Sequence, residues 1–155
     1  MIEVVLRGEA EQLAFGAELA RACSQQRVLL FLEGDLGAGK TTLVRGLLHG
    51  LGHKGTVKSP TYTLIEPYVI DGRRVYHLDL YRVADPSELE YLGLREILAE
   101  PALVLVEWPQ RGAGWLPAPD LALSLQHLDG ARRVRIDAIG EVGEALVERL
   151  HRNLQ

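Results

Sequence analysis

Gly34-Asp35-Leu36-Gly37-Ala38-Gly39-Lys40-Thr41-Thr42 fits the pattern G-x-x-x-x-G-K-[ST] of a phosphate-binding loop, and the rest of the chain can be interpreted around it. An all-apolar run, Val28–Leu32, precedes the loop and is typical of a buried parallel strand. Leucines recur every fourth residue from Leu43 to Leu51 and predict a helix with one apolar face, which Gly52 would close as its C-cap. A strand, a glycine-rich loop and a helix form the context that this motif requires.

The residue types of the loop suit the binding of a nucleoside triphosphate. Glycines let the backbone bend so that successive N–H groups point at phosphate oxygens, and the positive end of the helix dipole adds to the attraction. We expect Lys40 to reach the β- and γ-phosphates and the Thr41 hydroxyl to ligate Mg²⁺. The residues expected to bind the nucleotide are Asp35, Leu36, Gly37, Ala38, Gly39, Lys40, Thr41 and Thr42.

The size and composition of the chain predict one domain that covers residues 1–155. Met1–Arg7 lacks the basic start and long apolar core of a signal peptide, and no run approaches the roughly 18 apolar residues of a membrane span. Cys23 is the only cysteine and falls in an apolar helical pattern, so we expect a buried thiol and no disulfide or cysteine metal site. These features predict a cytoplasmic protein without membrane attachment.

The charge balance argues against a protein that grips nucleic acid by itself. The formal net charge is −4 at pH 7, whereas neutralising phosphates requires clustered lysines and arginines. Two basic pairs, Arg73-Arg74 and Arg132-Arg133, are interpreted as solvated strand ends.

The remaining patterns predict an α/β fold, a single P-loop NTPase-like domain whose mixed sheet carries antiparallel hairpins and is flanked by helices. Asp71-Gly72 and Asp129-Gly130 are hairpin turn signals, and a hairpin is unusual in a doubly wound nucleotide-binding sheet. Further strands are expected at 1–7, 61–68, 74–81, 102–107, 121–128 and 132–139. Further helices are expected at 9–25, from 85 to the break at Gly93, at 94–99 and at 140–153, with a loop at 109–120.

Two acidic residues end predicted strands, Asp79 and Glu107. An acid at the carboxyl end of a sheet strand projects into the crevice where ligands bind. Because Glu107 follows the more apolar strand, we expect it to be the carboxylate on the metal side, and Asp79 to polarise water or bond a metal-bound water. The alternative is that one of the two only caps a strand or forms a salt bridge.

Ser59-Pro60-Thr61-Tyr62-Thr63 lies where a nucleotide-sensing switch often sits, between the phosphate-loop helix and the next strand. A hydroxyl there can meet Mg²⁺ or the γ-phosphate; the alternative is a turn followed by the start of a strand. Trp108 either shields the site, faces a partner or packs on the core. The five histidines have no metal-ligand spacing, and His77 is expected to stack on the sheet. Asn153 is the only asparagine, so the guanine-reading Asn-Lys-x-Asp pattern is absent and ATP is favoured over GTP.

Four segments together resemble the successive motifs of the TsaE (YjeE-type) family. They are Gly34–Thr42, Val57–Leu64, His77–Arg82 and Val106–Pro109. The resemblance covers nearly the whole chain and keeps the motif order of the family. It implies the ATPase of bacterial tRNA threonylcarbamoyladenosine synthesis, working with TsaD, which transfers the threonylcarbamoyl group, and with its partner TsaB.

The resemblance also implies roles for single residues. Lys40 and Thr41 would hold phosphate and Mg²⁺, and Glu107 would complete the metal site. Asp79 and Thr61 would be needed for turnover.

Two positions differ from the pattern of the family. Many members carry Glu after the Trp-Pro pair at a position implied to contact the nucleotide, where this chain has Gln110. Members often place a Thr near the adenine at the start of the first helix, where this chain offers Glu9 and Glu11.

Three functions are compatible with these features. The favoured one is a partner-activated ATPase: no arginine finger follows the switch segment, so we expect weak ATP hydrolysis until a partner completes or orders the site. The alternative is a small-molecule kinase, which needs an arginine-bearing lid over its acceptor, and Arg111–Ala118 is the only candidate loop. The third possibility is a nucleotide-dependent interaction switch with negligible hydrolysis. The acidic balance predicts that partners, rather than this chain, hold most of the tRNA.

Overall fold

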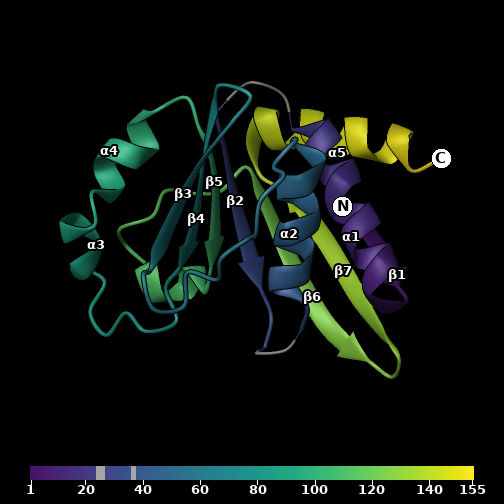
Figure 1. Cartoon of the computed structure of the whole chain (residues 1–155), viewed down its shortest axis with the longest axis horizontal. Coiled ribbons are helices and arrows are strands. Elements are labelled where there is room, and N and C mark those ends of the chain that lie inside the picture. Colours follow the sequence, from purple (N-terminus) through teal and green to yellow (C-terminus); the bar gives the residue numbers. More distant parts are fainter. Residues whose placement is uncertain (24–26, 36–37) are drawn as a thin grey trace.

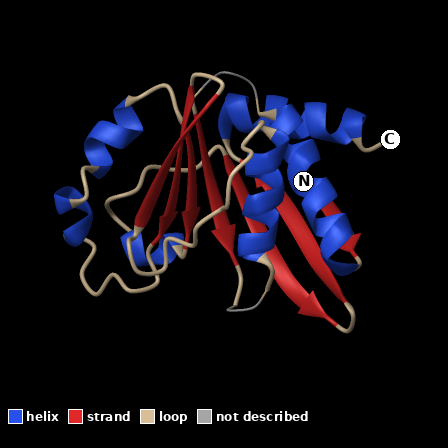
Figure 2. Cartoon of the chain, viewed as in Figure 1, coloured by secondary structure: helices blue, strands red, loops and turns tan. Residues whose placement is uncertain are grey.

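A computed structural model describes residues 1–23, 27–35 and 38–155, which are arranged around one mixed sheet (Figures 1 and 2). Within these residues the sheet has seven strands in the order β1-β7-β6-β2-β5-β4-β3. The strands are β1 (Ile2–Leu6), β2 (Val28–Glu33), β3 (Ile65–Ile70), β4 (Arg73–Asp79), β5 (Leu103–Glu107), β6 (Leu121–Leu128) and β7 (Ala131–Ala138). The helices are α1 (Gly8–Ala22), α2 (Lys40–Gly50), α3 (Glu88–Tyr91), α4 (Leu94–Ala99), the 3₁₀ helix η1 (Pro109–Gly112) and α5 (Gly140–Asn153).

The direction of the strands changes from the centre of the sheet to its edges. β6, β2, β5 and β4 run parallel, whereas β3 pairs with β4, β7 with β6 and β1 with β7 in the antiparallel sense. The β3–β4 hairpin turns at Asp71 and Gly72, whose φ angles of 50° and 78° have the sign that a two-residue type I′ turn requires. The parallel centre brings the carboxyl ends of β2, β5 and β4 to one edge of the sheet.

Each face of the sheet is covered by its own hydrophobic cluster. In β2 the alternation of side chains sends Val28, Leu30 and Leu32 to one cluster and Leu29 and Phe31 to the other. The first cluster includes residues of α1, α2 and α5, and the second includes residues of α3 and α4. Figure 1 shows α1, α2 and α5 grouped over the β7 side, and α3 and α4 beyond β4 and β3. The result is an α/β domain of the predicted class, with hairpins in a mixed sheet.

The segment before β3 differs from the expected strand at 61–68. Residues 61–63 form a turn, and the strand begins at Ile65. The N–H of Leu64 donates to the Pro60 carbonyl over 2.8 Å, which closes the turn, and the N–H of Asp79 donates to Leu64 O over 3.0 Å. β-branched residues predicted a strand here, but these contacts hold the segment against the end of β4 instead.

Smaller differences from the predictions concern the ends of helices. The first helix ends at Ala22 with Cys23 as its C-cap, and the last two residues of the expected helix, 24 and 25, lie outside the described residues. The helix expected from 85 begins at Glu88, preceded by a turn in which the Ser87 N–H donates to Asp85 Oδ1. The expected loop at 109–120 opens with η1.

Arg73 contradicts the expectation of a solvated strand end, because it is only 6% exposed and donates to Cys23 O over 3.3 Å. Cys23 is buried as predicted, and burial raises the pKa of its thiol to about 11. No helix in the described part of the chain is long and apolar enough to cross a membrane.

Candidate functional site

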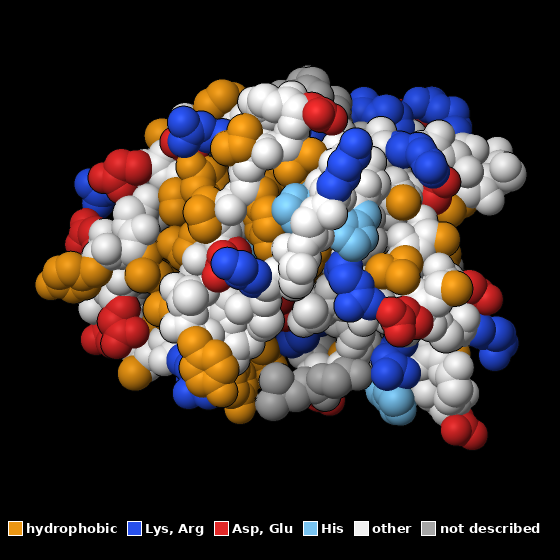
Figure 3. Space-filling view, viewed as in Figure 1, with side chains coloured by type: hydrophobic (Ala, Val, Ile, Leu, Met, Phe, Trp, Pro, Cys, Tyr) orange, Lys and Arg blue, Asp and Glu red, His pale blue; other side chains and the backbone are white. Residues whose placement is uncertain are grey.

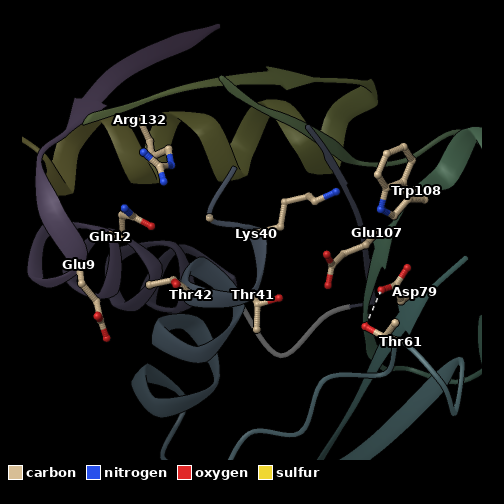
Figure 4. A pocket seen from close by; sticks show the side chains of 11 residues that line it. Glu9, Gln12, Lys40, Thr41, Thr42, Thr61, Asp79, Glu107, Trp108 and Arg132 are labelled. Atoms are coloured by element: carbon tan, nitrogen blue, oxygen red, sulfur yellow. Dashed lines mark hydrogen bonds between the residues drawn. The ribbon is translucent and has the colours of Figure 1, made fainter. Parts of the chain in front are cut away.

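A cavity of about 420 Å³ lies where the start of α2 faces the carboxyl ends of β4 and β5 (Figure 4). Its lining combines hydroxyl, carboxylate, amide and cationic side chains. The lining residues are Glu9, Gln12, Gly39, Lys40, Thr41, Thr42, Thr61, Asp79, Glu107, Trp108 and Arg132. They come from segments far apart in the sequence, which the parallel centre of the sheet and the helix after β2 bring together.

Lys40 is the first residue of α2 and is only 5% exposed. Its Nζ donates to the Gly34 carbonyl over 2.6 Å and lies 4.2 Å from the centre of the Trp108 ring. Burial lowers the pKa of Lys40, and the nearby carboxylates, Glu107 first, oppose that shift. A poorly solvated ammonium group of this kind favours an anionic ligand, and phosphate is the anion predicted from the sequence of the loop.

Asp79 and Glu107 face the cavity as neighbours. They are register partners in the parallel β4–β5 pair, and Glu107 is also the partner of Leu32 in β2. Both carboxyl groups are buried, Asp79 at 7% and Glu107 at 4% exposure. The shared register explains why two acids 28 positions apart in the sequence end at one place.

Burial raises the pKa of Asp79. The backbone N–H of Tyr81, which donates to Oδ1 over 3.0 Å, acts in the opposite direction, and the neighbouring Glu107 adds to the increase. A carboxyl group with a raised pKa at the edge of such a cavity is suited to accepting a hydrogen bond from water and exchanging a proton with it.

The segment 59–63 contacts the end of β4. The Thr61 hydroxyl donates to Asp79 Oδ2 over 3.5 Å and is 2.7 Å from the Ser59 hydroxyl. Figure 4 shows Thr61 beside Asp79 on the rim of the cavity. The segment therefore reaches the site.

The donor set on the metal side is one hydroxyl and one carboxylate. Figure 4 shows the Thr41 hydroxyl and the Glu107 carboxylate facing the same hollow. Among the described residues no group of three or more His, Cys, Asp or Glu side chains could hold a metal ion. Hard oxygen donors in small number fit Mg²⁺, which is commonly held by one or two protein groups together with substrate phosphates and water.

Some of the expected nucleotide-binding residues lie outside the cavity lining. Asp35 is exposed, and its carbonyl accepts the N–H of Ala38, which is buried in the core. Gln110 is exposed on η1. The expected contacts of Leu36 and Gly37 lie outside the described residues.

The structure adds cavity residues that the sequence did not indicate. Arg132 was interpreted as a solvated strand end, but it is half-buried and lines the cavity from the start of β7. Gln12 lines it from α1, where its Oε1 lies beside Gly39, whose φ of 100° is a conformation that favours glycine. Neither residue belongs to a local pattern, because each reaches the site through the pairing of distant elements.

His77 was expected to stack on the sheet. It is fully buried, and its Nε2 lies 2.6 Å from Oε2 of Glu107. Residues two apart on a strand share a face, so the position of His77 two residues before Asp79 could have predicted that it lies on the side of the sheet that carries the site.

Comparisons with known proteins match the chain to one family. A family model described as "Threonylcarbamoyl adenosine biosynthesis protein TsaE" matches residues 6–135. A protein named "tRNA threonylcarbamoyladenosine biosynthesis protein TsaE" from Haemophilus influenzae is 43% identical over 143 residues, which are 90% of each chain. One of the same name from Bacillus subtilis is 39% identical over 138 residues, 88% of this chain and 86% of the relative. The crystal structure of Bacillus subtilis YdiB superposes with a TM-score of 0.83 at 33% identity and covers 99% of this chain and 96% of that one.

Proposed function

The chain belongs to the TsaE family, and from that premise we propose that it binds and hydrolyses ATP with Mg²⁺ for the threonylcarbamoyl modification of adenosine in tRNA. The observation that carries the proposal is the convergence of Lys40, Thr41, Asp79 and Glu107 on one cavity. The protein would act in the cytoplasm with the TsaD and TsaB proteins as a partner-activated ATPase.

Each residue has a role that its position supports. Lys40 would move from Gly34 O to the phosphates, since an anion is a stronger partner for the buried ammonium than its own loop carbonyl. Thr41 and Glu107 would hold Mg²⁺, which when bound neutralises charge on the β- and γ-phosphates. Asp79 would orient the attacking water, and Thr61 would hold the Asp79 carboxylate in place.

The loose contact between the 59–63 segment and Asp79 supports dependence on a partner. The hydrogen bond from Thr61 to Asp79 is 3.5 Å, at the limit of a useful interaction. A partner that presses the 59–63 segment onto the site would shorten it and order the groups around the water. We expect slow turnover by the chain alone, because phosphoryl transfer depends on positioning.

The distribution of surface charge supports indirect contact with tRNA. Figure 3 shows acidic and basic side chains interspersed on the face in view, without a continuous basic stripe. With a net charge of −4 the chain itself offers little attraction for a polyanion. The partner proteins would hold most of the tRNA.

The test is release of free phosphate from ATP by the chain with and without a TsaB–TsaD pair. We expect low release alone and a clear increase with the pair, both lost in Lys40→Ala. The exposed substitution His151→Gln is the control and should behave as wild type. Full-speed hydrolysis by the chain alone, unchanged by partners, would contradict the proposal. Transfer of phosphate to a small-molecule acceptor would indicate a kinase instead.

A further inference from the structure

The buried histidine of β4 touches the site but takes no part in the roles proposed above. His77 is 0% exposed, in a strand whose Val75 and Leu78 are also fully buried. Its Nε2 is 2.6 Å from Glu107 Oε2. Its Nδ1 is buried and has no hydrogen-bond partner among the residues that the structure describes. A buried polar ring needs a hydrogen-bond partner, and Glu107 is that partner for His77.

The contact with Glu107 is made by one nitrogen of the ring. Nδ1 has no hydrogen-bond partner in the described part of the chain, so Nε2 alone meets a polar group. A carboxylate that ligates a metal accepts hydrogen bonds, so Nε2 of His77 is the donor to Oε2 of Glu107 in the proposed site. One oxygen of Glu107 is thereby occupied, and the other remains available to the cavity.

The strand register places this bond on the core side of the site. His77 is paired with Leu105, one step along the same face from the Asp79–Glu107 pair. The histidine therefore supports the Glu107 carboxylate from the buried side, while Thr41 faces that carboxylate across the hollow (Figure 4). Because both strands are hydrogen-bonded to a neighbour on each side, His77 has little freedom to move.

We propose that His77 is a positioning residue for Glu107, holding one carboxylate oxygen so that the other is aimed at the Mg²⁺ of bound ATP. The proposal rests on the proposed function, because it takes Glu107 to be the carboxylate on the metal side. Groups that hold a metal-ligating side chain in place typically contribute 10–100-fold to metal affinity. His77 itself does not touch nucleotide or metal.

The test measures binding rather than turnover, on the full chain. A non-hydrolysable fluorescent ATP analogue is titrated in EDTA and at increasing Mg²⁺ concentrations. We expect His77→Phe to bind the analogue in EDTA as wild type does. It should need roughly 10–100 times more Mg²⁺ to reach half of the increase in analogue affinity that Mg²⁺ causes. His77→Gln carries an amide N–H that can reach Glu107 and should restore most of the Mg²⁺ response.

Two controls separate positioning from stability. Val75→Ala weakens the same strand without touching Glu107 and should leave the Mg²⁺ midpoint unchanged. In a Glu107→Gln background, His77→Phe should have no further effect on the midpoint, since its action passes through that carboxylate. If His77→Phe does not fold, His77→Asn, whose amide is too short to reach Glu107, should show the same loss of Mg²⁺ response.

The outcomes distinguish the two proposals. A folded His77→Phe or His77→Asn protein with the wild-type Mg²⁺ midpoint would overturn the positioning role, as would an undiminished effect in the Glu107→Gln background. Wild-type protein that bound the analogue with no response to Mg²⁺, or not at all, would instead overturn the proposed function.

Discussion

At the scale of single residues, the site holds ionisable groups in places that favour their neutral forms. Burial raises the pKa of Asp79 and lowers that of Lys40, although each stands near groups of opposite charge. Such groups cost folding stability at neutral pH and are retained where function needs them.

Asp79→Asn should therefore increase the free energy of unfolding at neutral pH. Because the pKa of Asp79 is higher in the folded than in the unfolded protein, the unfolded state ionises first as pH rises. The free energy of unfolding therefore falls as the pH rises from the pKa of Asp79 in the unfolded protein to its pKa in the folded protein. Above the pKa in the folded protein this loss of stability stays constant. Asparagine does not ionise and keeps an oxygen for the Tyr81 N–H.

Urea unfolding from pH 3 to 8 would check this prediction. The difference in the free energy of unfolding between Asp79→Asn and wild type should grow as the pH rises through the acidic range and then level off. The variant should hydrolyse ATP more slowly than wild type. Asp137→Asn, which removes a half-exposed carboxyl that is paired with Arg135 on β7, is the control and should show no such gain. A variant less stable than wild type at neutral pH would show that the attraction to Lys40 outweighs the cost of burial.

At the scale of elements, the close approach of α1 and α2 depends on two glycines. A Cβ on Gly46 would lie 2.5 Å from the Leu13 carbonyl oxygen, and one on Gly16 would lie 2.5 Å from that of Leu43. Both obstacles are backbone atoms, which cannot rotate away. The packing fixes the start of α2, and Lys40 with it, against α1.

Gly46→Ala should destabilise the protein although alanine is the better helix former. Helix propensity alone favours the substitution by about 1 kcal/mol. Forcing the two helices apart costs roughly 1–3 kcal/mol or more, so we expect a net loss. Chemical denaturation measures it, and His49→Ala, on the exposed face of α2, is the control that should stay near wild type. A more stable Gly46→Ala protein would show that the helices separate easily.

The elements also show how much of the fold could be predicted from sequence. Period and turn chemistry predicted the bounds of α5 and of β6, and placed the Asp71-Gly72 turn, because those signals are local. The turn at residues 61–63 was mistaken for strand, since its conformation depends on contacts with β4. The two acids were found from their places at strand ends, whereas Arg132 and Gln12 reach the cavity only through pairings between distant segments.

At the scale of the whole molecule, ligand binding at the cavity should stabilise the entire sheet. The site joins the start of α2 to the ends of β4 and β5 and to the 59–63 segment, so a bound nucleotide connects parts that belong to both hydrophobic clusters. A ligand that binds only the folded state at 100 times its Kd adds about 2.7 kcal/mol to the free energy of unfolding.

For a chain of this size that gain corresponds to an increase in Tm of roughly 5–10 °C. A thermal melt with a non-hydrolysable ATP analogue and Mg²⁺ at saturating concentration should show it. We expect no increase in Lys40→Ala, which lacks the cation for the phosphates, and the same increase as wild type in His151→Gln. An equal increase in Lys40→Ala would mean that the analogue stabilises the chain without this buried lysine, and so from a place other than the cavity that Lys40 lines.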